Sequence, residues 1–160
     1  MTSALPFAMR ELPQASPGAV SLFRAKFGTD PPDCPRHFVA LSTDDGSVCG
    51  YIHFRTFEPH VYLCGGLLVD ERVYRRLPAN VRARVKGVGS LSRWLSDTAI
   101  GMLGPKRAVL AYTGNLSSRR DALALGFEET SYPFVLVQWH SEPPSERPAL
   151  LARVAGNGPF

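Results

Sequence analysis

The sequence RVKGVGSLSRWLSDTAIGML, residues 84–103, joins a glycine-rich turn to an amphipathic helix. The apolar residues of one helical face follow at the expected spacing: Val88, Leu91, Leu95, Ile100 and Leu103. The helix is expected to begin near Gly89 and to end before Gly104 and Pro105. At a helix start, unpaired backbone N–H groups and the helix dipole attract anions, and glycine lets a phosphate approach the backbone closely. The stretch therefore predicts a pyrophosphate-binding turn.

Strand and helix patterns alternate on both sides of this stretch. Toward the N-terminus the pattern predicts a helix over residues 17–28. It also predicts three strands, over residues 37–42, 48–57 and 60–70. Toward the C-terminus it predicts a strand, a helix and a last strand, over residues 107–115, 117–127 and 132–140. Gly65 and Gly66 interrupt the third strand, and paired glycines in a strand usually mark a bulge. This order predicts an α/β fold in a single domain, with a mixed sheet and helices on both faces.

The two ends of the chain carry weaker patterns. Residues 1–17 contain three prolines without sustained periodicity, which predicts an irregular entry with room for one first strand. Residues 18–140 are expected to form the α/β domain itself. The prolines and glycines of residues 141–160 predict a loose C-terminal tail.

Composition restricts the class of protein. The hydrophobic fraction of 44% and charged fraction of 20% over 160 residues are ordinary for one globular domain. Cys34, Cys49 and Cys64 fit neither a disulfide framework nor a zinc pattern, and no fourth ligand accompanies His53, His60 and Cys64, so no metal site is predicted. No segment resembles a signal peptide or a membrane span, which favours a cytoplasmic protein without membrane contact. The net charge of +4 is compatible with a polyphosphate ligand, an acidic substrate or a nucleic acid.

Two sequence blocks carry a resemblance to a known family. Arg84, Gly87 and Gly89 match the turn Arg/Gln-x-x-Gly-x-Gly/Ala, and residues 115–127 run from an asparagine to a Gly-Phe pair. Together with the order of elements, these blocks resemble the GNAT superfamily of acyl-CoA-dependent N-acyltransferases over residues 18–140. In that family the turn binds the pyrophosphate of coenzyme A, and the asparagine approaches its pantetheine arm.

The resemblance implies an activity and a ligand. The donor would be acetyl-CoA or another acyl-CoA, and the acyl group would pass directly to the amine of a small molecule or a peptide. The residues that the resemblance assigns to the cofactor site are Leu68, Val69, Arg84, Lys86, Gly87, Val88, Gly89, Asn115 and Arg119.

The chain departs from the family at the general acid. Many members place a tyrosine four residues before the Gly-Phe pair, where this chain has Ala122. Tyr112 or Tyr74 is predicted to protonate the leaving thiolate instead. The proton of the amine is predicted to pass to Asp70 or Glu71, with His60, Glu58 and a water relay as the alternatives. A module that binds acyl-CoA without turnover is the alternative that Ala122 favours.

A second departure is an insertion before the glycine-rich turn. Residues 70–83 are polar and arginine-rich, with Pro78 interrupting them, which predicts a long connection or a short helix. We expect this segment to form the acceptor side of the site, with Arg75 and Arg76 attracting a carboxylate-bearing acceptor. Its arginines also leave open an acyltransferase that acts on aminoacyl-tRNA. The sequence does not exclude a homodimer.

Overall fold

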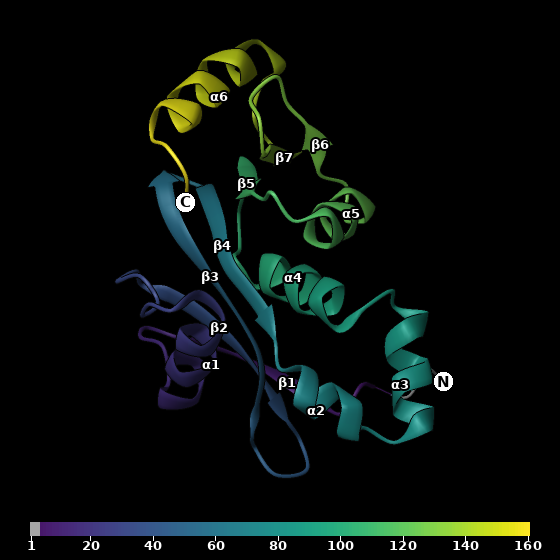
Figure 1. Ribbon diagram of the computed structural model, residues 1–160. Helices are drawn as coiled ribbons and strands as arrows, with labels where there is room; N and C mark the ends of the chain where they lie inside the picture. The colour runs from purple at the N-terminus through teal and green to yellow at the C-terminus, as the bar shows by residue number, and fades with distance from the viewer. Residues whose placement is uncertain (1–3) are drawn as a thin grey trace.

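The protein folds around a seven-stranded sheet in the order β1-β2-β3-β4-β5-β7-β6 (Figure 1). The computed structural model describes residues 4–160. The strands are β1 (Phe7–Leu12), β2 (Arg36–Ser42), β3 (Val48–Glu58), β4 (Val61–Val69), β5 (Ala108–Tyr112), β6 (Glu128–Glu129) and β7 (Val135–Trp139). β4 and β5 run parallel and the other neighbouring strands run antiparallel, which confirms the predicted mixed sheet.

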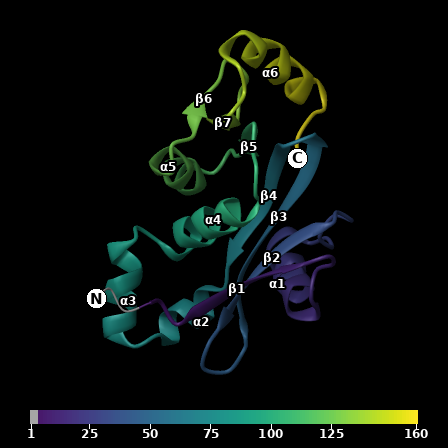
Figure 2. The same cartoon turned by 180° about the vertical axis from the view of Figure 1, so that it is seen from behind.

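Helices cover both faces of this sheet, as predicted (Figures 1 and 2). They are α1 (Pro17–Phe27), α2 (Glu71–Arg76), α3 (Ala79–Gly87), α4 (Leu91–Met102), α5 (Leu116–Ala124) and α6 (Arg147–Gly156), with a short 3-10 helix η1 (Pro144–Glu146). Phe23 of α1 packs against Tyr51 of β3, whereas Leu95 of α4 packs in a cluster with Ile52, the next residue along the strand. Because successive strand residues point to opposite faces, α1 and α4 lie on opposite sides of the sheet.

Polar caps determine where three of the helices begin. Ser16, Ser90 and Asn115 precede α1, α4 and α5, and the side-chain oxygen of each accepts a hydrogen bond from a backbone N–H of the first turn. Such caps satisfy donors that the helix itself leaves unpaired. The helix predicted to follow the glycine-rich turn is confirmed, with its first residue at Leu91.

β4 separates from β5 halfway along its length. The two strands pair only over residues 61–64 of β4 and 108–111 of β5. Gly66 then has a φ of +64°, a left-handed conformation that favours glycine. In this region β4 contains one residue more than the facing stretch of β3, which confirms the predicted bulge. Beyond the bulge no β5 residue pairs with β4 in the described sheet, and the sheet is split.

The C-terminal segment corrects our prediction of a loose tail. Residues 147–156 form α6, and its residues Leu150 and Val154 are fully buried against β4, β5 and β7. Arg153 of α6 also bonds to Glu58 at the end of β3, with the nearer atoms 2.6 Å apart. Proline is compatible with the first turn of a helix, and residues 150 and 154 form an i, i+4 apolar pair, so the proline content of the segment was misleading.

The N-terminal boundary of the domain also moves. β1 pairs with β2, which confirms the first strand that we allowed for in residues 1–17 and places it inside the domain predicted to start at residue 18. Residues 1–3 of that segment lie outside the described residues. The insertion forms the two short helices α2 and α3 on either side of Pro78. Within residues 4–160 no helix has the length and apolarity to cross a lipid bilayer.

Candidate active site

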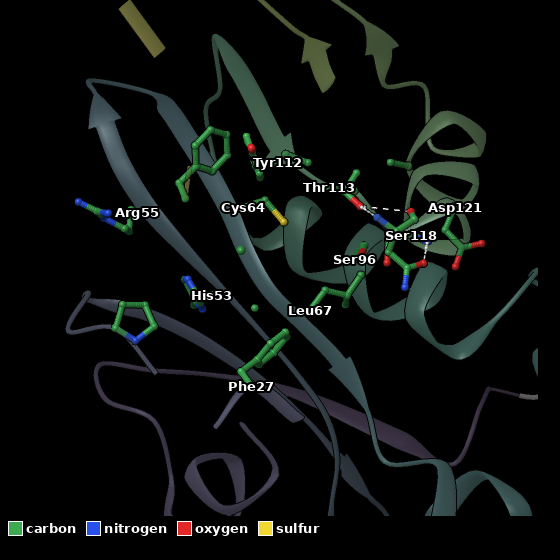
Figure 3. Close-up of a pocket in the computed structure, with 18 of the residues that line it drawn as sticks. Phe27, His53, Arg55, Cys64, Leu67, Ser96, Tyr112, Thr113, Ser118 and Asp121 are labelled. Atoms are coloured by element: carbon green, nitrogen blue, oxygen red, sulfur yellow. Dashed lines mark hydrogen bonds between the residues drawn. The ribbon is translucent and has the colours of Figure 1, made fainter. Parts of the chain in front are cut away.

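A cavity of about 660 Å³ lies at the split between β4 and β5, and we call it the split cavity (Figure 3). On the α1 side its walls include Phe23, Phe27, Pro32, His53, Arg55 and Phe160. On the α4 and α5 side they include Ser96, Ile100, Ser118, Asp121, Ala122 and Leu125. The cavity is therefore lined from both faces of the sheet, with Gly65 and Gly66 at the bend between them.

A second cavity, of about 790 Å³, lies at the N-terminus of α4, and we call it the α4 cavity. Residues 89–93 form part of its wall, including the glycine before the helix and the first turn. The two cavities have five lining residues in common: Lys26, Leu67, Asn115, Ser118 and Asp121. The two cavities therefore adjoin at these residues, one at the start of α4 and the other reaching the α1 face of the sheet, and we call the pair the passage.

The α4 cavity is electrostatically suited to an anion. Four cationic residues line it, and they are Lys26, Lys86, Arg93 and Arg120. Two acidic residues, Glu71 and Asp121, also line it. The excess of cations adds to the positive end of the α4 dipole and to the N–H groups of its first turn.

The carboxylate of Asp121 accepts hydrogen bonds from side chains at the start of α4. Asp121 of α5 is only 7% exposed and accepts hydrogen bonds from the hydroxyls of Ser90 (2.9 Å) and Ser92 (2.6 Å). The guanidinium of Arg93 contacts the same carboxylate at 3.4 Å and lies over Gly89, where a Cβ would come within 2.4 Å of it. The start of α4 thus holds one oxyanion of the chain itself, the carboxylate of Asp121.

His53 of β3 borders the split cavity where β4 bends. Its side chain is 5% exposed, and Nδ1 has no hydrogen-bond partner among the described residues. The imidazole lies against the bend, because a Cβ at Gly66 would come within 2.6 Å of Nδ1 and a Cβ at Gly65 within 2.9 Å of Nε2. Burial, followed by the charges of His37 and Arg55, lowers the pKa of His53 to about 4. The ring is therefore neutral at physiological pH.

Solved structures share this architecture. No protein-family model and no curated protein matches the sequence. A GCN5-related N-acetyltransferase from Brucella melitensis aligns with a TM-score of 0.50 at 15% identity, over 94% of this chain and 83% of that chain. An IAA acetyltransferase from Bacillus cereus aligns with a TM-score of 0.51 at 19% identity, over 78% of this chain and 79% of that one. An acetyltransferase of the GNAT family from Streptococcus pneumoniae aligns with a TM-score of 0.51 at 14% identity, over 83% and 98%.

The chain has the GNAT fold. The strand order, the parallel β4–β5 pair and the helix start beside it are the parts of this fold that build the passage. The fold predicted from the sequence is thereby confirmed.

The residues predicted to bind the cofactor fall into two groups, according to whether they line a cavity. Five of them line the α4 cavity: Leu68, Val69, Lys86, Gly89 and Asn115. The other four line neither cavity: Arg84, Gly87, Val88 and Arg119. The predicted turn is shorter than we expected, because α3 continues through Gly87 and only residues 88–90 separate it from α4. Arg84 instead donates to the carbonyl oxygen of Ala4 at 2.9 Å, and Arg119 pairs with Glu129.

Asn115 has a capping role at this end of the fold. Its Oδ1 accepts hydrogen bonds from the backbone N–H groups of Ser117 and Ser118 at the start of α5. Both cavities reach Asn115, so the residue lies where the two cavities adjoin. The sequence analysis did not single out four residues that line the α4 cavity: Ser90, Ser92, Arg93 and Arg120. Their positions in the N-terminal parts of α4 and α5 are the sequence signal that could have indicated them.

The predicted catalytic residues lie in three different places. Tyr112 lines the split cavity, as its assignment requires. Glu71 and Tyr74 line the α4 cavity, on the cofactor side of the passage. Asp70 lines neither cavity, because its carboxylate caps α2 at the N–H of Arg72 and pairs with the same guanidinium, which lowers its pKa. These positions do not support Asp70, Glu71 or Tyr74 as groups that contact the reacting atoms.

The residues predicted to form the acceptor wall lie outside both cavities. Arg75 and Arg76 of α2 line neither cavity. The insertion folds as α2 and α3 beside the start of α4, so it borders the cofactor end of the passage (Figure 1). Arg55 and Lys26 are the cations that the split cavity contains. The sequence analysis did not predict that His53 borders a cavity. Its imidazole fits there because Gly65 and Gly66 of the neighbouring strand have no side chains.

Two further residues of the split cavity limit its chemistry. Ala122 lies on its wall, at the position where the family resemblance places a tyrosine. Cys64 of β4 also lines the cavity, and burial raises the pKa of its thiol to about 12, so it is not a thiolate at neutral pH. No group of three metal-ligating side chains comes together within residues 4–160.

Proposed function

We propose that this protein is an acyl-CoA-dependent N-acyltransferase that moves an acyl group, with acetyl as the first donor to test, from coenzyme A to an amine. The supporting observation is the pair of adjoining cavities, one at the cationic start of α4 and the other at the split in the sheet, which reaches the α1 face. Two substrates that enter from opposite faces meet at the bend of β4. Such an arrangement accelerates a two-substrate reaction by holding the reactants together.

The residues of the α4 cavity would hold the donor. Lys86, Arg93 and Arg120 supply positive charge, and the first turn of α4 supplies N–H groups for the pyrophosphate. Coenzyme A contributes a thioester, whose carbonyl carbon accepts a nucleophile. Beyond Gly66 the backbone of β4 lacks a β5 partner, so its peptide groups facing the split are available to a ligand and to the thioester oxygen.

The split cavity favours direct transfer from donor to acceptor. Cys64 of β4 is a side chain of the split cavity that could form a covalent acyl-enzyme intermediate. Its raised pKa keeps it as a thiol, which is a poor nucleophile. Tyr112 stays our proposal for the group that protonates the leaving sulfur, because its side chain lines the cavity close to the end of the β4–β5 pairing. Its ring is packed between Phe134 and Phe160 at centroid distances of 5.7 and 5.8 Å.

Ala122 favours a second candidate function. A module of the same fold that binds acyl-CoA without turning it over needs no general acid, and Ala122 provides no proton donor where the family commonly has one. The two functions share the α4 cavity and differ only in chemistry at the split.

The deciding experiment measures binding and chemistry separately. Calorimetry with coenzyme A tests the α4 cavity, and release of free thiol from acetyl-CoA, with and without a panel of primary amines, tests turnover. An N-acyltransferase binds coenzyme A and releases thiol in an amine-dependent way. Binding without amine-dependent release identifies the non-catalytic module, and absence of binding contradicts both functions. Tyr112→Phe should lower amine-dependent release by a factor of ~10 to 10² and leave coenzyme A affinity unchanged.

A further inference from the structure

Four aromatic side chains line the α1 side of the split cavity. Phe23 and Phe27 of α1, Tyr112 of β5 and Phe160 line it, with Pro32 beside them (Figure 3). The ring of Phe160 packs edge-on against Tyr112 at a centroid distance of 5.8 Å, so two aromatic rings already contact each other in this space. Phe27 remains 44% exposed, which is unusual for a phenylalanine. A flat apolar group is therefore the shape that this side accommodates.

The same cavity has no unpaired carboxylate for an ammonium ion among the residues described. Its two acidic residues are Asp30, which pairs with Arg24, and Asp121, which accepts hydrogen bonds from Ser90 and Ser92. Its other charged residues, Lys26 and Arg55, are cations. A protonated amine would lose its hydration and gain no counter-charge here, so its entry is disfavoured.

His53 provides a hydrogen-bond acceptor at the bend of β4. The titratable or charged groups near its ring are His37 of β2 and Tyr51 and Arg55 of β3. His37 is itself engaged, because its Nε2 donates to the carbonyl oxygen of Cys34 and its Nδ1 accepts from the hydroxyl of Tyr51, both at 2.6 Å. The imidazole of His53 has no comparable partner at Nδ1. It is the one neutral base that borders the cavity in residues 4–160.

We propose that the acceptor is an aromatic amine that is uncharged at neutral pH, and that its N–H group hydrogen-bonds to the imidazole of His53. This inference rests on the proposed N-acyltransferase function. The aromatic body lies among Phe23, Phe27 and Phe160, and the nitrogen reaches the bend at Gly65 and Gly66.

The chemical step follows from this placement. The nitrogen lone pair forms the N–C bond to the thioester carbonyl, and the C–S bond breaks with its electron pair on sulfur. The nitrogen becomes more acidic as the bond forms, so even a weak base such as His53 can take its proton. The thiolate of coenzyme A then takes one proton from Tyr112 or from water. The proton held by His53 afterwards restores the group that protonated the thiolate, either Tyr112 or water. The products are an N-aryl amide and coenzyme A.

Two isomeric amines test the proposal. 4-Methylaniline and benzylamine have the same composition, but at neutral pH the first is uncharged, whereas the second is an alkyl ammonium ion with a pKa of about 10. We expect kcat/KM for 4-methylaniline to exceed that for benzylamine by at least ~10-fold at neutral pH, and the ratio to fall as the pH rises toward the pKa of benzylamine. Binding of 4-methylaniline, but not of benzylamine, should shift the NMR signals of the His53 ring at neutral pH.

A pair of histidine variants locates the proton acceptor. His53→Gln keeps a polar group of similar size and should lower kcat for 4-methylaniline by ~10² or more without changing coenzyme A affinity. The matched control, His37→Gln, changes the neighbouring buried imidazole that lines neither cavity, and it should retain kcat within ~3-fold when its melting temperature confirms folding.

The outcomes separate this inference from the proposed function. Amine-dependent turnover with an equal or better rate for benzylamine at neutral pH, or unchanged kcat in His53→Gln, overturns the acceptor assignment and leaves the N-acyltransferase function intact. Binding of 4-methylaniline at His53 without turnover of any amine contradicts the transferase function instead. If a histidine variant fails to fold, the comparison of the two amines with the unmodified protein still decides, because it needs no substitution.

Discussion

The two ends of the passage differ in the kind of group that lines them. At the α4 end, the polar lining groups are the backbone N–H groups at the start of α4, serine hydroxyls and four cationic side chains. At the α1 end they are aromatic rings and a neutral imidazole, held on strands and on α1. In the functions that we propose, the first end recognises the charge of the donor in contact with solvent, and the second recognises the shape and protonation state of the acceptor. We therefore expect salt to affect the first end and pH to affect the second.

The largest effect is expected at the bend that joins the two ends. In Gly66→Ala the new Cβ would come within 2.7 Å of both His53 and Phe23, and the residue would have to keep a positive φ. We expect a loss of roughly 3 kcal/mol of unfolding free energy and a fall in turnover of about 10² or more. Urea denaturation and thiol release measure the two effects.

Gly46 provides the matched control for this variant. Its φ is +71°, but a Cβ there would meet nothing within 4 Å. Gly46→Ala should therefore cost only about 1 kcal/mol, from the backbone conformation alone, and should leave turnover unchanged. Equal costs in the two variants would show that the close packing at the bend is not what requires glycine.

The next effect concerns pH and the α1 end. Unfolded histidine has a pKa of about 6.5, and folding lowers that of His53 to about 4. Between these values the unfolded chain binds more protons, so this contribution to stability is full at neutral pH and is lost as the pH falls. Between pH 7 and pH 5 the loss from His53 should be about 2 kcal/mol. Urea midpoints at the two pH values, compared between the wild type and His53→Gln, isolate this contribution from that of His37, whose pKa is also lowered by burial.

A smaller effect is expected from charge reversal at the α4 end. Lys86→Glu combined with Arg120→Glu removes two cations from the wall of the α4 cavity. The dissociation constant of coenzyme A should rise about tenfold at low salt and approach that of the wild type as salt increases. The control is Arg75→Glu with Arg76→Glu, which makes the same change in net charge at exposed positions outside both cavities. Equal losses in the two double variants would mean that net charge, and not the cavity, sets the affinity.

The sequence predicted the α4 end better than the α1 end, and the reason is physical. A glycine-rich turn followed by a helix is a local pattern, and its ligand contacts come from consecutive residues. Even there, the boundary of α3 was missed, since nothing in residues 84–87 stops a helix before Gly87. The α1 end depends on His53 meeting two glycines of the adjacent strand across a bulge. Strand register of this kind is a tertiary property that a single sequence does not display.

The ends of the chain show the same limit. The possible strand in the first residues is β1, and the segment that we expected to be loose is α6. The helix α6 depends on the burial of Leu150 and Val154 against β4, β5 and β7, and on the ion pair between Arg153 and Glu58 of β3. Proline and glycine content describes the local chain, whereas the stability of a short helix comes mainly from such packing.

The four-residue pairing between β4 and β5 also has a consequence for folding. β1 to β4 form one antiparallel unit from consecutive segments, and β5 to β7 form another, so each gains most of its contacts locally. The ladder that joins them is parallel and pairs residue 61 with residue 108, which carries a high loop-closure cost. We expect the two units to acquire structure first and their junction to close last. A ligand that bridges the junction would then retain the native state mainly by slowing unfolding, because the contacts that it reinforces are absent from the transition state.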